Sequence, residues 1–234
     1  MSREPEDRVS SGQRVGRGLP RPVEACLALA GIVVAAPVIA FAAVAIIATS
    51  GWPVFFRQTR VGRGGKPFTL VKLRSMRSAH GGPQVTARCD PRVTAVGALL
   101  RRTKLDELPE LWNVLRGDMS FVGPRPEVPA YVDLSDPIWA RILKVRPGLT
   151  DPVTLKLRDE EELMEAVEGE DRERYYRETL QPLKLAGYQD YLQRRTAWSD
   201  IGVICDTILA LLPGRRSRLA SRAPADLSER PPNS

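Results

Sequence analysis

The chain has 234 residues and carries 35 Lys and Arg against 28 Asp and Glu, a formal net charge of +7 at pH 7. This length allows one globular core with appendages, and the excess of cations indicates an anionic partner: phosphate, nucleic acid or an anionic membrane surface. The single histidine, His80, nearly removes His-based metal sites and triads, and the three cysteines lack the spacing of a disulfide framework or a zinc site. We therefore expect any chemistry to rest on carboxylates and cations.

Residues 1–20 mix charges with Gly, Ser and Pro, which predicts a disordered arm. Residues 25–50 then run for 26 positions without a charge, long enough to cross a bilayer. Pro37 lies in the middle, where proline tends to kink a helix. Arginines near both ends place both on the cytoplasmic side by the positive-inside rule. From the residues alone, a single kinked span and a helix-break-helix returning to the same leaflet stay equally open.

Residues 68–76 are predicted to form a strand in which Lys72 and Arg74 project from one face. Two cations on one side of a strand could clamp a diphosphate, and a solvated strand face is the alternative. The Gly-rich residues 62–66 lack the spacing of a phosphate-binding P-loop and are interpreted as a tight turn between strands. Residues 57–104 contain twelve Lys or Arg but a single acid, Asp90, which is the charge pattern of an anion site.

Residues 105–120 place two adjacent carboxylates, Asp106 and Glu107, at the start of a short amphipathic helix. The apolar side chains at helical spacing are Leu108, Leu111, Trp112 and Leu115. Pro109 fits only a first helical turn, so both carboxylates are expected at or just before the positive end of the helix, where anions are favoured. The spacing of Thr103 and Asp106 resembles a capping box, which makes a mere helix cap the alternative for Asp106.

Two rigid turns that each carry an arginine follow this helix. Pro124 and Pro126 flank Arg125, whose guanidinium suits two phosphate oxygens. The alternative is a structural ion pair of Arg125 with Glu127 or Asp118. Residues 145–150 form the second turn, which holds Arg146.

The C-terminal third is predicted to be largely helical. Residues 159–176 carry many carboxylates at helical spacing, which is typical of a solvated face. Residues 188–212 contain two more amphipathic pieces, and the last is too short to span a bilayer, so it could lie against protein or in the membrane interface. Residues 213–234 are predicted to be a disordered basic tail.

An acidic pair inside a basic shell needs a cation between itself and a bound anion, and magnesium held by carboxylates and diphosphate oxygens fits. Asp106 could attack a phosphorus covalently, kept ionised by the helix end and by Arg101 and Arg102. Glu107 could hold the metal, which neutralises the charge that develops on the diphosphate.

Six stretches together resemble the bacterial sugar transferases, the small monotopic phosphoglycosyl transferases. They are residues 51–62, 72–76, 105–109, 112–120, 122–126 and 146–150, and the resemblance extends over about 21–212. It implies transfer of a sugar 1-phosphate from a nucleoside diphosphate sugar, by default a UDP-sugar, to undecaprenyl phosphate. This is the first membrane step of surface polysaccharide or glycoconjugate synthesis.

The resemblance also implies residue roles. Asp106 would be the nucleophile that forms a covalent phosphosugar intermediate, and Glu107 would assist Mg²⁺, with both carboxylates at the metal. The candidate substrate-binding residues are Lys72, Arg74, Arg101, Pro124, Arg125, Pro126 and Arg146. The membrane segment would break at Ala36 and Pro37 and return to the cytoplasmic face of the bacterial inner membrane, which favours the re-entrant form.

The predicted fold is α+β and mainly helical. Its expected parts are a disordered arm at 1–20, a re-entrant helical hairpin at 21–50, a cytosolic catalytic domain with interfacial amphipathic helices at 51–212, and the tail at 213–234. Larger relatives carry additional N-terminal membrane helices, and this chain is expected to correspond to the minimal catalytic form. Besides the two substrates and membrane lipid, downstream glycosyltransferases and a second copy of the chain are candidate partners, and no nucleic acid is expected.

Three departures from the family pattern stand out. Ala36 replaces the serine that often precedes the proline, Glu110 replaces a usual Gln, and residues 151–155 replace a common Gly-Trp-Ala-Gln-Val. Because the last region could help to choose the sugar, the resemblance does not identify it. Two other functions stay open: a membrane-anchored basic binding module without catalysis, and a metal-dependent phosphohydrolase that uses the same residues.

Overall fold

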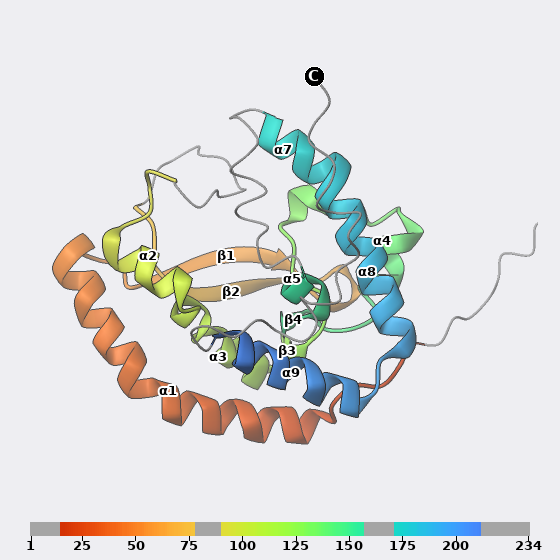
Figure 1. Cartoon of the computed structure of the whole chain (residues 1–234), viewed down its shortest axis with the longest axis horizontal. Helices are drawn as coiled ribbons and strands as arrows, with labels where there is room; N and C mark the ends of the chain where they lie inside the picture. The colour runs from red at the N-terminus through yellow and green to blue at the C-terminus, as the bar shows by residue number, and fades with distance from the viewer. Residues whose placement is uncertain (1–14, 78–89, 157–170, 212–234) are drawn as a thin grey trace, which may run out of the picture.

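The computed structural model describes residues 15–77, 90–156 and 171–211 (Figure 1). The predictions for residues 1–14, for the tail at 213–234 and for most of the acidic helix at 159–176 lie outside these ranges. The α-helices are α1 (Arg21–Ser50), α2 (Ala95–Arg102), α3 (Glu110–Arg116), α4 (Pro137–Ile142), α5 (Pro152–Lys156), α7 (Asp171–Tyr175), α8 (Gln181–Arg194) and α9 (Ala197–Leu211). The predicted mainly helical character is confirmed.

Two small sheets complete the fold. Strands β1 (Phe55–Val61) and β2 (Pro67–Leu73) pair antiparallel, with Phe55 opposite Leu73, and β3 (Ser120–Val122) pairs parallel with β4 (Gly148–Thr150). The expected strand at 68–76 is therefore confirmed but ends earlier. The tight turn is also confirmed: Gly64 and Gly65, both at positive φ, connect β1 to β2.

Helix α1 follows an arc along one edge of the molecule (Figure 1). Its 30 residues stay helical through Pro37, so the expected break is a bend within one continuous helix. A proline removes one backbone hydrogen bond and clashes with the carbonyl four residues earlier, and bending relieves that clash without ending the helix. Within the described residues, α1 is the one helix long and apolar enough to cross a bilayer. The side chains of Ala36 and Pro37 are exposed.

Both ends of α1 are fastened to the same folded unit. Near its start, Arg21 Nη2 donates to the Leu115 carbonyl at 2.6 Å, and the buried Glu24 carboxylate accepts from Phe121 N at 3.3 Å. At its end, Arg74 donates to the backbone carbonyls of Ser50, Gly51 and Trp52. Near this end, one face of α1 also packs into an apolar core cluster, made of Ala42, Ile46, Val54, Leu73 and Leu100.

The last six residues of the expected disordered arm are described, and they pack against the C-terminal helices. Gly16 N donates to the Leu192 carbonyl at 2.9 Å, and Leu19 N donates to Asp200 at 3.1 Å. Asp200 is fully buried and pairs with Arg195 at 2.8 Å. Residues 15–20 are ordered because this buried ion pair and the core offer their backbone and side chains partners that the sequence pattern does not reveal.

Candidate active site

Asn113 joins helix α3 to strand β2. Its Nδ2 donates to the Thr69 carbonyl at 2.7 Å, and its Oδ1 accepts from Val71 N at 3.2 Å. The side chain thus pairs with the β2 edge that β1 leaves open, as a neighbouring strand would. Lys72 is the residue of β2 that follows Val71. The contact with Asn113 therefore sets the position of Lys72 relative to α3.

Asp106 and Glu107 lie in a 3-10 turn, Leu105–Glu107, which Leu108 and Pro109 separate from α3. Lys104, before the turn, adopts a left-handed conformation with φ of 56°. Pro109 is the N-cap residue of α3, so the helix begins slightly later than predicted. Neither the turn nor α3 has a side-chain cap, so the capping interpretation of Asp106 is wrong.

The apolar face predicted for this helix is also partly wrong. Trp112 is 52% exposed, whereas Asn113 and Val114 are buried. The helix turns its Asn113 side toward β2 because the strand edge needs hydrogen-bond partners. A large indole can instead remain at a surface.

Glu107 is the centre of a half-buried ion cluster. Its Oε1 lies 2.8 Å from Lys72 Nζ and 2.5 Å from Arg125 Nη2, and Lys72 Nζ also lies 3.1 Å from Glu110 Oε1. The predicted alternative ion pairs of Arg125 are therefore wrong. Glu127 instead faces Lys184 at 3.6 Å, and the described partner of Asp118 is Arg116.

The two neighbouring carboxyls are shifted in opposite directions. Burial raises the pKa of Glu107, but the charges of Arg125 and Lys72 outweigh it and hold that pKa well below its usual range. Burial and the negative charge of Glu107 raise the pKa of Asp106, against the opposing charges of Lys72, Lys104 and Arg101. We expected nearby arginines to hold Asp106 ionised. Arg101 does lower the pKa of Asp106, but the effect of burial on that pKa is larger.

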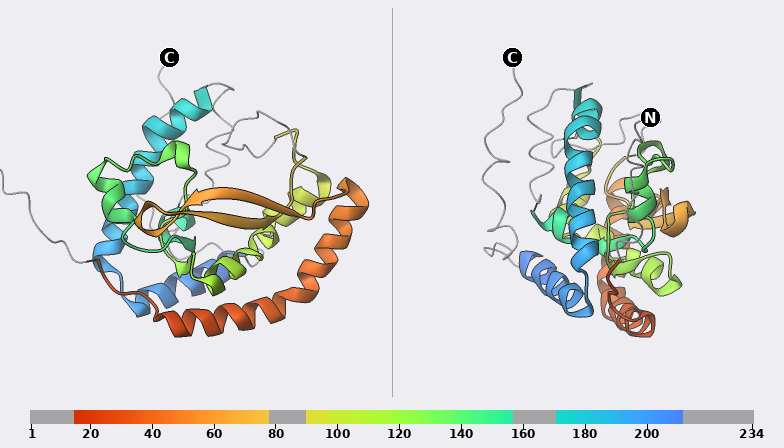
Figure 2. Two further views of the ribbon diagram at one scale, coloured as in Figure 1. Left: turned by 180° about the vertical axis from the view of Figure 1, so that it is seen from behind. Right: turned by 90° about the vertical axis from the view of Figure 1, so that its right-hand side faces the viewer.

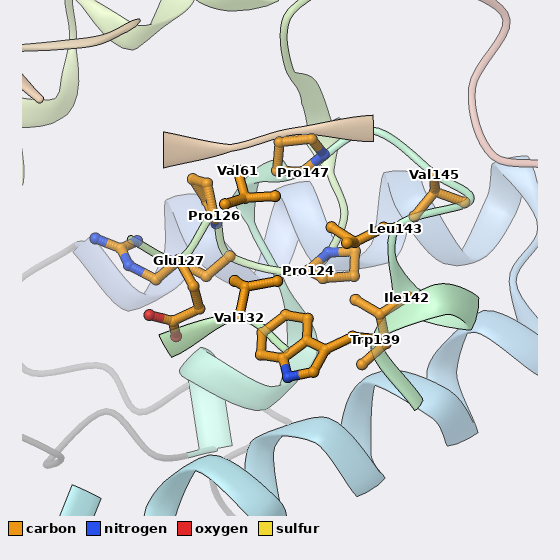
Figure 3. Close-up of a pocket in the computed structure, with 11 residues that line it drawn as sticks. Val61, Pro124, Pro126, Glu127, Val132, Trp139, Ile142, Leu143, Val145 and Pro147 are labelled. Carbon is orange, nitrogen blue, oxygen red and sulfur yellow. The ribbon is translucent and has the colours of Figure 1, made fainter. Parts of the chain in front are cut away.

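The loop that carries Arg125 is held at several points. Gly148 N donates to the Pro124 carbonyl, and Arg60 donates to the Pro126 carbonyl, both at 2.9 Å. Both prolines are buried. Behind them lies a small apolar pocket with the Trp139 ring among its walls (Figure 3). The loop therefore presents Arg125 to Glu107 from a rigid base.

The remaining predicted substrate residues occupy other positions. Arg74 binds the carbonyls at the end of α1, and Arg146 Nε donates to the Gly117 carbonyl at 2.9 Å, at the end of α3. Arg101 contacts the Met76 sulfur at 3.5 Å and acts electrostatically on Asp106. The structure thus brings Lys72, Arg125 and the two carboxylates together, while the substrate roles of Arg74 and Arg146 stay predictions.

The carboxylate oxygens of Asp106 and Glu107 suit a hard cation such as Mg²⁺ only if a bound ligand supplies further oxygen atoms. Asp106 Oδ1 is buried and accepts no hydrogen bond from the described residues. The described part of the chain contains no group of three or more metal-ligating side chains. One or two carboxylates with phosphate oxygens form the usual magnesium site, so Asp106 and Glu107 fit such an ion together with a bound diphosphate.

Sequence reasoning missed two supporting groups. Asn113 was expected merely as part of an amphipathic helix, and the buried contact of Glu127 with Tyr176 and Lys184 was not expected at all. A polar residue among apolar neighbours in a short helix was the signal available for Asn113. The Glu127 contact joins distant segments and leaves no local pattern.

Comparison with known proteins places the whole chain in context. A family model described as "Bacterial sugar transferase" matches residues 16–214. A UDP-glucose:undecaprenyl-phosphate glucose-1-phosphate transferase of Caulobacter vibrioides is 41% identical over 183 residues, which is 76% of this chain and 63% of the relative. A putative undecaprenyl-phosphate N-acetylgalactosaminyl 1-phosphate transferase of Bacillus subtilis is 47% identical over 115 residues, 48% of this chain and 64% of the relative.

A UDP-glucose:undecaprenyl-phosphate glucose-1-phosphate transferase of Escherichia coli is 45% identical over 142 residues, 58% of this chain and 30% of the relative. In all three comparisons the match covers less than two thirds of the relative's length.

Proposed function

The chain belongs to the bacterial sugar transferase family, and we propose that it transfers a sugar 1-phosphate from a UDP-sugar to undecaprenyl phosphate. The observation that carries this proposal is the cluster of Asp106 and Glu107 with Lys72 and Arg125. It combines a carboxylate whose buried Oδ1 accepts no hydrogen bond from the described residues with two cations suited to a diphosphate. The relatives are named for glucose and for N-acetylgalactosamine, so either sugar is a candidate.

In the first step, a carboxylate oxygen of Asp106 attacks the phosphorus that carries the sugar. The bond from that phosphorus to the bridging oxygen breaks, and UMP leaves with the electron pair. Asp106 must be ionised, which the charges of Lys72, Lys104 and Arg101 favour against the effect of burial on its pKa. The product is a sugar phosphate joined covalently to Asp106.

In the second step, a phosphate oxygen of undecaprenyl phosphate attacks the same phosphorus. The bond to Asp106 breaks, which restores the carboxylate and gives undecaprenyl-diphosphate-sugar. Lys72 and Arg125 neutralise the diphosphate in both steps. A magnesium ion held by Glu107 and Asp106 would add charge neutralisation at the leaving phosphate.

We propose a monotopic membrane position on the cytoplasmic face of the bacterial inner membrane, and two features of the fold support a membrane position of this kind. Both ends of α1 contact the same folded unit, as a re-entrant helix requires, while much of its apolar surface is exposed. Helix α9 lies at the same end of the molecule as the first half of α1 (Figure 2). Its exposed apolar side chains are Trp198, Ile201, Ile208 and Leu211. An interfacial surface of this kind supports the proposal, because it would bring the site close to a lipid substrate.

The test uses the full chain in detergent or nanodiscs with Mg²⁺, radiolabelled UDP-glucose or UDP-N-acetylgalactosamine, and undecaprenyl phosphate. Asp106→Asn replaces one carboxylate oxygen by nitrogen, so we expect lipid-linked sugar to fall by at least about 10³-fold, as for loss of other nucleophiles. The folded protein and its membrane association should remain. Mass spectrometry after incubation with donor alone should find a phosphosugar adduct on Asp106.

Each alternative outcome has a distinct signature. Full turnover by Asp106→Asn would refute the covalent mechanism. Release of free sugar phosphate without need for undecaprenyl phosphate would identify a phosphohydrolase. Absence of any turnover or adduct in the parent protein with either donor would favour a binding module.

A further inference from the structure

A buried polar group lies next to Arg125 in the same loop. Glu127, two residues after Arg125, is 8% exposed and accepts a short hydrogen bond from the Tyr176 hydroxyl. Lys184 Nζ lies 3.6 Å from the same carboxylate oxygen and 3.4 Å from the Tyr176 hydroxyl. The residues come from the loop, from the π-helical segment Tyr176–Leu180, and from α8.

Burial of this group is costly, because a carboxylate and an ammonium must both leave water. The cost is offset only when the geometry is well fixed, and here it is fixed from several sides. Lys184 Nζ also lies over the Tyr176 ring, 5.1 Å from its centroid, and that ring packs on Tyr131 at 5.2 Å. The loop cannot shift at Glu127 without breaking contacts with two helical segments.

This attachment is transmitted to Arg125 over a short, stiff stretch of chain. Pro126 separates the two residues, is buried, and has its carbonyl held by Arg60. The backbone of Glu127 is also tied down, because its carbonyl accepts from Val61 N at 2.9 Å. Arg125 itself lies 2.5 Å from Glu107, measured from Nη2 to Oε1.

We propose that Tyr176 and Lys184 are positioning residues that act through Glu127 to hold the Arg125 guanidinium where the donor diphosphate binds. The inference rests on the proposed function, in which Arg125 contacts that diphosphate. It assigns the α7–α8 segment, more than forty residues away along the chain, an indirect part in donor affinity.

The matched pair of variants is Tyr176→Phe and Tyr175→Phe. Tyr176→Phe removes the hydroxyl that donates a hydrogen bond to Glu127 and keeps the ring packed on Tyr131. Tyr175→Phe removes the hydroxyl of a neighbouring, half-buried tyrosine in the same apolar cluster. Isothermal titration of the full chain with UDP measures donor binding without turnover. We expect Tyr176→Phe to raise the Kd by roughly tenfold, since hydrogen bonds to charged groups are the strong class, and Tyr175→Phe to leave it unchanged.

A double-mutant cycle with Arg125→Ala separates positioning from simple stability. If Tyr176 acts through Arg125, its substitution should have little effect on UDP affinity once Arg125 is gone. An equal loss of affinity in both backgrounds would overturn the inference, as would unchanged UDP binding by Tyr176→Phe. Lys184→Met should reproduce the pattern if it folds, and failure of a folded Lys184→Met to do so would remove Lys184 from the proposal.

The two proposals fail in different ways. Sugar-phosphate transfer by the parent protein together with an additive cycle would overturn this inference alone. A coupled cycle in a protein that makes no lipid-linked product would overturn the proposed function alone. A parent protein that binds no UDP would overturn the inference, because Arg125 would then hold no donor diphosphate.

Discussion

The carboxyls of Asp106 and Glu107 are adjacent in the chain, but their surroundings shift their pKa values in opposite directions. Glu107 lies between two cations and has a depressed pKa, whereas Asp106, one residue earlier, is buried beside that negative charge and has a raised one. Two titratable groups whose surroundings push their pKa values apart are typical of an active site. The pattern suits a nucleophile next to a permanently charged metal ligand.

Asp151 is a second buried acid with a raised pKa, and it departs from the family pattern. It accepts hydrogen bonds from Val153 N, Thr154 N and the Thr154 hydroxyl at the start of α5, while burial outweighs them and raises its pKa. A carboxyl whose pKa is raised by folding stabilises the protein fully below the unfolded pKa. That stability is lost as pH rises through the folded pKa.

We therefore predict that Asp151→Asn becomes progressively more stable relative to the parent as pH rises from about 4 toward neutrality. Asparagine caps a helix about as well as aspartate, so the cap is retained while the charge is removed. Thermal unfolding of both proteins in detergent across that pH range measures the difference. A difference in Tm that is constant, or that shrinks as pH rises, would contradict the prediction.

Among the secondary-structure elements, α3 and β2 define the site by their mutual position. Asn113 supplies both hydrogen bonds between them that involve the open strand edge, so its loss leaves the Thr69 carbonyl and the Val71 N–H without these partners. Both bonds are partly buried, and an unsatisfied backbone group costs about 1–3 kcal/mol when it is fully buried.

Asn113→Ala should accordingly lower the free energy of unfolding by about 2–4 kcal/mol, measured by urea titration in detergent. Asp190→Asn breaks a surface ion pair with Arg194 and serves as the control, which we expect to change stability little. Equal stabilities of the two variants would refute the structural role of Asn113.

For the whole molecule, the path of α1 relative to the membrane decides where the site faces. A re-entrant helix leaves both flanks in the cytoplasm, whereas a single span leaves one flank on each side. Arg17 and Arg57 are exposed and flank α1. Arg17→Cys and Arg57→Cys, each in a background without other cysteines, therefore report the two flanks separately.

In intact cells, neither cysteine should react with a membrane-impermeant maleimide, and both should react after permeabilisation. The reason is that both ends of α1 are fastened to one folded unit, which in the proposed topology lies on the cytoplasmic side. Labelling of one position from outside would establish a single span instead.

Local sequence patterns predict many of the secondary-structure elements of this molecule. The charge-free run at 25–50, the β1–β2 turn, and the acidic turn before a short helix were all predictable, because each depends on neighbouring residues. The Pro-Arg-Pro turn was recognisable for the same reason. The family, too, follows from the sequence, since its motifs occur in order along the chain.

What the sequence by itself determined were the local elements, the family and the adjacent pair of carboxylates at the start of a short helix. Only the tertiary structure decided that Arg125 pairs with Glu107, that Arg74 and Arg146 bind helix ends, and that burial raises the pKa of Asp106. It also decided that Asn113, not Trp112, faces the strand. The physical reason is that ion pairing and desolvation depend on which distant segments meet, and no local spacing records those meetings.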